Sequence, residues 1–164
     1  LRLLKILYLQ NNQISFLDEE CFSPIINLEL LNLNQNKISK LTKFYFRNLT
    51  HLSQLDLFKN NIDYIDESCF INNKNLIYLH LDYNNLTHIY SKTFESFYLL
   101  KNIRLNNNRL SNISSMLFRS CVRIYEIDLS SNLIENIENE TFANLKQLKN
   151  IKLESNLIKL LGHS

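Results

Sequence analysis

Histidine, cysteine and acidic side chains are the groups of this chain that could do catalytic or metal chemistry, and their spacing assembles no site. No histidine has a second histidine or a cysteine at the spacing of zinc ligands, and no serine, histidine and acid are placed to act as a nucleophilic triad. A single glycine leaves no phosphate-binding loop. The sequence therefore predicts no enzyme, no catalytic residue, no metal site and no cofactor. The four histidines are His51, His80, His88 and His163.

The elements that must position these side chains come from a repeat. Residues 28–51 read LELLNLNQNKISKLTKFYFRNLTH, in which Leu31 and Leu33 have the two-residue period of a strand. Asn36 follows as a corner, and a return path then brings Phe46 inward. Such a unit cannot bury its own apolar side, so it needs copies stacked on both sides.

Copies of this unit follow one another every 24 residues, without insertion, from Leu4 to the end of the chain. The sixth position of each unit is leucine, the ninth is asparagine, and the nineteenth is phenylalanine wherever the chain reaches it. Backbone groups lose their strand partners where the chain turns, and an asparagine side chain can both donate to and accept from them. We therefore predict a structural asparagine column of Asn12, Asn36, Asn60, Asn84, Asn108, Asn132 and Asn156.

The pattern LxxLxLxxNxIxxLxxxxFxxLxx resembles the leucine-rich-repeat family, and the 24-residue unit with its phenylalanine is similar to the "typical" extracellular repeats of Toll-like receptors, Slit proteins and small proteoglycans. The resemblance implies an α/β leucine-rich-repeat solenoid, right-handed, with a curved parallel sheet on the concave face and an irregular convex side. Residues 1–164 are predicted to form a single array of about seven repeats. Because the pattern starts and ends in mid-unit without cysteine-rich caps, we interpret the chain as a fragment.

Composition narrows the choice of partners. The net charge is only +2 and no basic run occurs, which argues against nucleic acid. No stretch approaches the roughly 20 apolar residues of a membrane helix, so no membrane contact is expected within this segment, although an anchor outside it is possible. The expected partner is a protein or glycan ligand.

The three cysteines and four sequons bear on location. Cys21 and Cys69 occupy equivalent positions two repeats apart, about 10 Å at one strand spacing per repeat, which is too far for a disulfide. Three free thiols favour a reducing compartment. The sequons favour an extracellular one, but the abundance of asparagine produces about as many by chance. The possible glycosylation sites are Asn48, Asn85, Asn112 and Asn139.

The open face of the predicted sheet carries the candidate binding residues. Position five carries acidic and basic residues in neighbouring repeats, so Asp56–His80, Arg104–Asp128 and Asp128–Lys152 are expected to pair across strands. The residues of this column either form exposed ion pairs with one another or contact a binding partner. Exposed aromatic groups beside it are typical interface anchors. The predicted ligand-binding residues are Phe58, Tyr78, His80, Asp82, Tyr83 and Arg104.

Two function classes follow from this fold and face. The first is a non-catalytic extracellular or cell-surface recognition module that binds a protein or glycan on the concave face, as in Toll-like receptors or repeat-type adhesion proteins. The second is a cytoplasmic leucine-rich-repeat scaffold or enzyme inhibitor.

One core position departs from the repeat pattern, because Asn73 stands where a leucine is expected. A buried amide there either finds backbone partners or loosens the return path.

Overall fold

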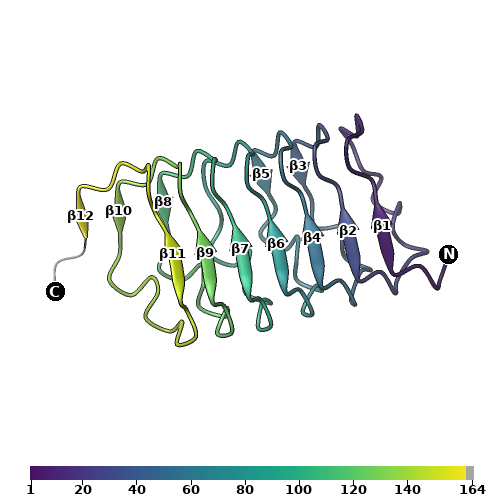
Figure 1. The fold of residues 1–164 in the computed structure, drawn as a ribbon. Helices are drawn as coiled ribbons and strands as arrows, with labels where there is room; N and C mark the ends of the chain where they lie inside the picture. Colours follow the sequence, from purple (N-terminus) through teal and green to yellow (C-terminus); the bar gives the residue numbers. More distant parts are fainter. Residues whose placement is uncertain (162–164) are drawn as a thin grey trace.

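The computed structural model describes residues 1–161 and shows a solenoid of stacked, short parallel strands (Figure 1). Among the described residues, seven three-residue strands form one sheet: β1 (Ile6–Tyr8), β2 (Leu30–Asn32), β4 (Gln54–Asp56), β6 (Tyr78–His80), β7 (Asn102–Arg104), β9 (Glu126–Asp128) and β11 (Asn150–Lys152). Two-residue strands lie on the return path: β3 (Lys40–Leu41), β5 (Tyr64–Ile65), β8 (Asn112–Ile113), β10 (Asn136–Ile137) and β12 (Leu160–Leu161). The predicted solenoid is confirmed, although residues 1–161 contain no helix.

The register of the seven-stranded sheet repeats every 24 residues. Ile6 pairs with Leu30, and the same offset continues through every neighbouring pair to Glu126 and Asn150. Successive side chains of each strand point to opposite faces, so the middle residue of each strand enters the core. Leu31, Leu55 and Leu79 are fully buried in this way. Equivalent positions of the repeat therefore form columns across the sheet.

A stack of phenylalanine rings fills the interior behind the sheet. The rings of Phe22, Phe46 and Phe70 lie nearly parallel, with centroid separations of 6.4 and 5.9 Å. Phe97 then bridges Phe70 to Phe94 at 5.4 and 5.3 Å. Offset aromatic contacts at these separations add to the hydrophobic stabilisation of burial. The predicted phenylalanine spine is thus present, with one interruption between Phe70 and Phe94, where Phe97 of the twenty-second position supplies the contact.

The asparagine column links each repeat to the one before it. Asn84 donates from Nδ2 to the carbonyls of Leu81 in its own repeat and Leu57 in the preceding one, both at 3.0 Å. Its Oδ1 accepts the backbone amide of Ile62 at 2.9 Å. The same pattern holds from Asn36 to Asn156. The column therefore satisfies polar groups at the corners, as expected.

The residue before each column asparagine has a positive φ between 54° and 59°. This left-handed conformation costs energy for residues other than glycine, and asparagine tolerates it best. The turn is nevertheless built without glycine throughout the described residues. The residues concerned are Asn11, Gln35, Lys59, Tyr83, Asn107, Ser131 and Ser155.

Asn73, the asparagine at a core position where a leucine is expected, is accommodated by backbone hydrogen bonds. Its side chain is fully buried and Nδ2 donates to the carbonyls of Phe46 and Leu49 at 3.0 and 2.9 Å. The amide thus finds backbone partners in the preceding repeat, which is the first of the two alternatives. Its Oδ1 accepts no hydrogen bond from the described residues.

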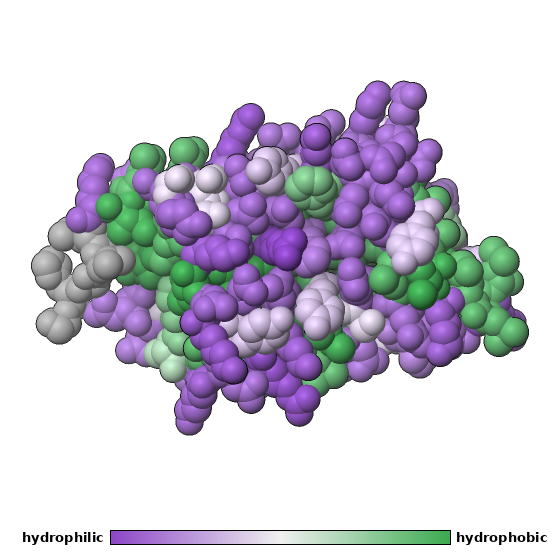
Figure 2. All heavy atoms as spheres, in the orientation of Figure 1, coloured by the Kyte–Doolittle hydropathy of each residue, from purple (hydrophilic) through white to green (hydrophobic). Residues whose placement is uncertain are grey.

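Burial weakens toward both ends of the described array. Leu4, Leu7 and Leu9 in the first repeat and Leu148 and Leu153 near the other end are only partly buried, whereas equivalent leucines in the middle are fully buried. Figure 2 shows hydrophobic residues gathered at the N-terminal end, while the middle of the same view is largely hydrophilic. Neighbouring repeats therefore supply most of the burial of each unit.

Candidate functional site

The outer face of the seven-stranded sheet, here called the strand face, holds a shallow depression of about 290 Å³. Parallel strands bring the third and fifth positions of adjacent repeats side by side, which is why residues far apart in sequence line it. Its lining residues are Gln54, Tyr78, His80, Asn102, Arg104, Tyr125 and Glu126.

Five of the six predicted ligand-binding residues fall into two groups, and Asp82 belongs to neither. Tyr78, His80 and Arg104 line the depression. Phe58 and Tyr83 instead pack against each other beyond the strand ends, with ring centroids 5.3 Å apart and nearly perpendicular planes. The expectation that all six side chains are open to solvent needs correction for Asp82, which is only 6% exposed.

The Asp82 carboxylate is an unusual member of this face. Its Oδ1 is buried and has no hydrogen-bond donor among the described residues. Burial raises the pKa of Asp82, and the Asp128 carboxylate adds to this effect, against a backbone hydrogen bond and the positive charge of His80 and Arg104. An ionised Asp82 is therefore poorly stabilised in the fold.

Asp56 has the opposite environment. Burial alone would raise its pKa, but the hydrogen bond and charge of His80, together with the Gln54 amide at 3.0 Å and the charge of Arg104, hold the pKa below its ordinary value. His80 Nδ1 contacts Asp56 Oδ1 directly. The predicted Asp56–His80 pair is thus present, and it is largely shielded from solvent.

The remaining predicted pairs have different outcomes. Lys152 Nζ lies 3.3 Å from Asp128 Oδ2, as expected, and 3.4 Å from Glu126. The predicted Arg104–Asp128 pair is absent from the ion pairs found among residues 1–159. Asp128 Oδ1 instead accepts the backbone amide and hydroxyl of Ser130. Arg104 is exposed and forms no ion pair among the described residues.

Four residues of the depression were missed by sequence reasoning. Gln54, Asn102 and Glu126 occupy the third position of their repeats, and Tyr125 the second. Gln54, Tyr78, Asn102 and Glu126 are register partners in turn, so the third position forms a column as regular as the fifth. Comparing that column across repeats would have found three of them.

The possible glycosylation sites differ in exposure. Asn112 and Asn139 are exposed, whereas Asn48 and Asn85 are half-buried. All three cysteines are free, with Cys21 exposed and the other two buried. Burial raises the pKa of the Cys121 thiol to about 12. His163 lies outside the described residues.

Among the described residues, no group of three or more histidine, cysteine, aspartate or glutamate side chains is placed to hold a metal ion. The part of the chain that the structure describes also contains no helix with the length and hydrophobicity needed to cross a membrane.

Comparisons with known proteins define the class. A leucine-rich-repeat model matches residues 2–62, and a model of BspA-type leucine-rich-repeat regions matches residues 72–164. A search of curated protein sequences finds no match. The chain belongs to the leucine-rich-repeat family, whose members are generally non-catalytic binding modules. The strand register has the 24-residue period, but the "typical" extracellular subtype stays a prediction.

Two solved structures show the same fold. A complex of TLR13 with ssRNA13 superimposes with a TM-score of 0.90 at 27% identity, covering 96% of this chain and 22% of the TLR13 chain. The leucine-rich-repeat domain of APL1B gives a TM-score of 0.76 at 25% identity, covering 82% of this chain and 40% of the other. The chain thus spans well under half of either protein. Because the first is a complex with RNA, the expectation that nucleic acid is no partner loses its support.

Proposed function

We propose that the chain is a recognition module that binds a protein or glycan ligand on the strand face. The observation that carries the proposal is Arg104, an exposed cation with no ion-pair partner among the described residues, in a depression flanked by Tyr78 and Tyr125. Arginine and tyrosine are enriched at the centres of protein interfaces, where the ring supplies area and the guanidinium supplies directed hydrogen bonds. The ligand group expected against Arg104 is a carboxylate, sulfate or phosphate.

The two rings of the aromatic pair beside the depression are proposed to have different roles. Tyr83 is 49% exposed and Phe58 is half-buried beneath it. Tyr83 therefore offers the ligand-facing surface, while Phe58 holds the ring in place through the perpendicular contact. A fixed aromatic ring loses little conformational freedom on binding, which favours affinity.

The location that we propose is extracellular or the cell surface, in the manner of a Toll-like receptor or an adhesion protein. The similarity to TLR13 and the exposed sequons at Asn112 and Asn139 support it. The alternative, a cytoplasmic scaffold or enzyme inhibitor, is favoured by the three free thiols. Secretion from a eukaryotic cell followed by glycosidase treatment separates them, because a loss of mass requires a glycan on Asn48, Asn85, Asn112 or Asn139.

The binding proposal is tested by immobilising the chain and screening secreted proteins, sulfated and neutral glycans, and single-stranded RNA. Arg104→Glu and Tyr83→Asn are the informative variants. Asparagine suits position 83 because Asn11 and Asn107 adopt the same positive φ at equivalent positions. Each change should weaken binding by about 2 kcal/mol, or some thirtyfold. The control is Lys92→Glu on the return path, and a complex weakened only by that change would refute the proposal.

A further inference from the structure

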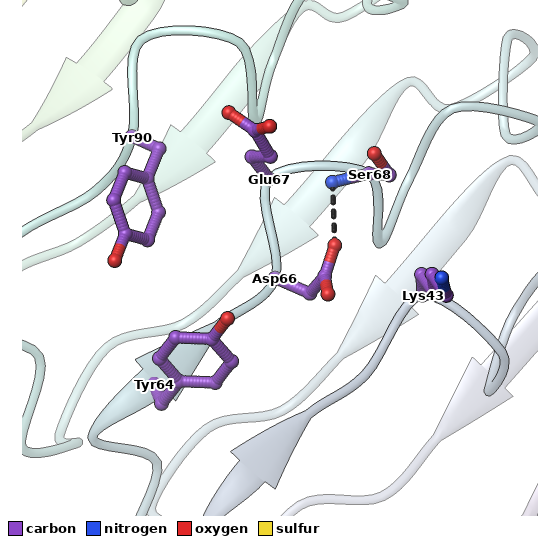
Figure 3. A pocket seen from close by; sticks show the side chains of 6 residues that line it. All are labelled: Lys43, Tyr64, Asp66, Glu67, Ser68 and Tyr90. Carbon is purple, nitrogen blue, oxygen red and sulfur yellow. Dashed lines mark hydrogen bonds between the residues drawn. The ribbon is translucent and has the colours of Figure 1, made fainter.

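The return path carries a second, separate pocket of about 450 Å³. It lies against β5 of the small two-stranded sheet rather than on the strand face, and residues from three successive repeats line it. Figure 3 shows the rings of Tyr64 and Tyr90 on one side of the pocket, Glu67 above them, the Asp66 carboxylate turned toward Ser68, and Lys43 on the far side. Ser68 also lines the pocket.

The two tyrosine rings form an exposed corner. Their centroids are 6.4 Å apart and their planes meet at 77°. His88 packs against the Tyr90 ring at 4.7 Å, with perpendicular planes, and so helps to fix its position. Tyr64 and Tyr90 are 37% and 42% exposed, which leaves ring surface available to a ligand.

The scaffold does not require a tyrosine at position 90. In other repeats the equivalent side chain accepts the backbone amide two residues further on, as Asp18, Asp66 and Ser114 do at 3.0, 2.8 and 3.3 Å. This contact caps the turn. A tyrosine ring cannot reach back in the same way, so repeat four gives up its cap and gains an exposed ring. Capping of the turn therefore does not account for the ring at this position.

Negative charge in the pocket is not neutralised by a basic side chain of the described residues. Neither Asp66 nor Glu67 forms an ion pair among the described residues. Lys43, the one basic side chain of the lining, places its Nζ 5.1 Å from the centroid of the Phe44 ring. Its charge is therefore directed at that ring. Aromatic faces with an adjacent free carboxylate attract a weakly hydrated organic cation.

We propose that this pocket binds an organic cation, namely an alkylammonium or guanidinium group, between Tyr64, Tyr90 and Glu67. The cation lies against the tyrosine rings and the Glu67 carboxylate balances its charge. The group comes from a lysine or arginine side chain of a partner or from a small free amine. The pocket is independent of the strand face, so the two proposals stand or fall separately.

The test is a titration of the 1–164 chain, labelled with ¹³C in its tyrosine rings, with tetramethylammonium. Saturable shifts confined to Tyr64 and Tyr90 are expected, with much weaker binding of the neutral analogue tert-butanol. Tyr90→Ser restores the residue type of the capped turns, and Glu67→Gln removes the charge. Each should weaken binding about threefold to fivefold.

The matched control is Glu19→Gln, at the same repeat position as Glu67 but without a tyrosine at the equivalents of Tyr64 and Tyr90. It should leave the titration unchanged. An acetylated, amidated peptide with one internal lysine, compared with n-butylammonium, distinguishes a partner side chain from a free amine. Equal binding of tert-butanol, or unchanged affinity in both Tyr90→Ser and Glu67→Gln, would overturn the proposal.

Discussion

The substitution Asn84→Ala probes the corner of a central repeat. Asn84 Oδ1 is the acceptor for the buried backbone amide of Ile62, and no other acceptor lies within its reach in the described structure. Nδ2 donates to three carbonyls. Those of Leu57 and Leu81 each keep a second donor from a neighbouring column asparagine, and that of Asp82 keeps the backbone amide of Lys59. Alanine therefore leaves one backbone amide without a partner.

The magnitude follows from that count. An unsatisfied buried amide costs about 1–3 kcal/mol, whereas the doubly bonded carbonyls lose little, so Asn84→Ala should lower the free energy of unfolding by about 2 kcal/mol. Asn12→Ala should cost less. Asn12 is exposed, donates only to the carbonyls of Leu9 and Gln10, and its Oδ1 accepts no bond from the described residues.

Urea unfolding followed by circular dichroism measures both variants, with Asn85→Ala as a neighbouring control. Asn85 makes no side-chain hydrogen bond among the described residues and lies one position beyond the column, so its loss should stay within about 0.5 kcal/mol. Equal losses for Asn84→Ala, Asn12→Ala and Asn85→Ala would refute the idea that the column acts by joining neighbouring repeats.

Three other changes give separate tests. Asp82→Asn should stabilise the chain at pH 7 and not at pH 3. The pKa of Asp82 is raised in the fold, so ionisation above about pH 4 favours the unfolded state. Urea midpoints at both pH values measure this, and a lower midpoint for the variant at pH 7 would contradict it. Phe70→Ala should lower the free energy of unfolding by about 3–5 kcal/mol, whereas Phe16→Ala, which removes an exposed ring, should change it by no more than about 0.5 kcal/mol. Similar unfolding midpoints for the two variants would show that the phenylalanine spine does not stabilise the fold. A thiol-reactive disulfide at pH 8 should modify Cys21 alone until urea exposes the rest, whereas rapid native reaction of Cys121 would contradict its burial.

The regular features of the fold were predictable because each satisfies the same physical need in every repeat. The type and spacing of Leu31 and Phe46 indicate buried positions, and Asn84 indicates a corner because its side chain can both donate and accept hydrogen bonds. Tyr78 and Arg104 could be placed on the strand face from register alone.

Other features depend on contacts that spacing does not encode. The positive φ of Tyr83 was hidden because the residue type changes from repeat to repeat while the backbone does not. The burial of Asp82 and the hydrogen bond from the Ser130 hydroxyl to Asp128, which has no ion pair with Arg104, are examples. The pocket beside Tyr90 was not predicted, because position fifteen of the repeat has no constant residue type.

The most direct test of ligand binding on the strand face is side-chain labelling of tyrosines with and without a bound ligand. Tyr78 and Tyr83 lie on or beside that face, and Tyr64 and Tyr90 lie on the return path, with exposed fractions of 37%, 49%, 37% and 42%. All four should therefore label to a similar extent in the free chain. A ligand from the binding screen should protect Tyr78 and Tyr83. Protection confined to Tyr64 and Tyr90 would contradict the proposal that this ligand binds on the strand face.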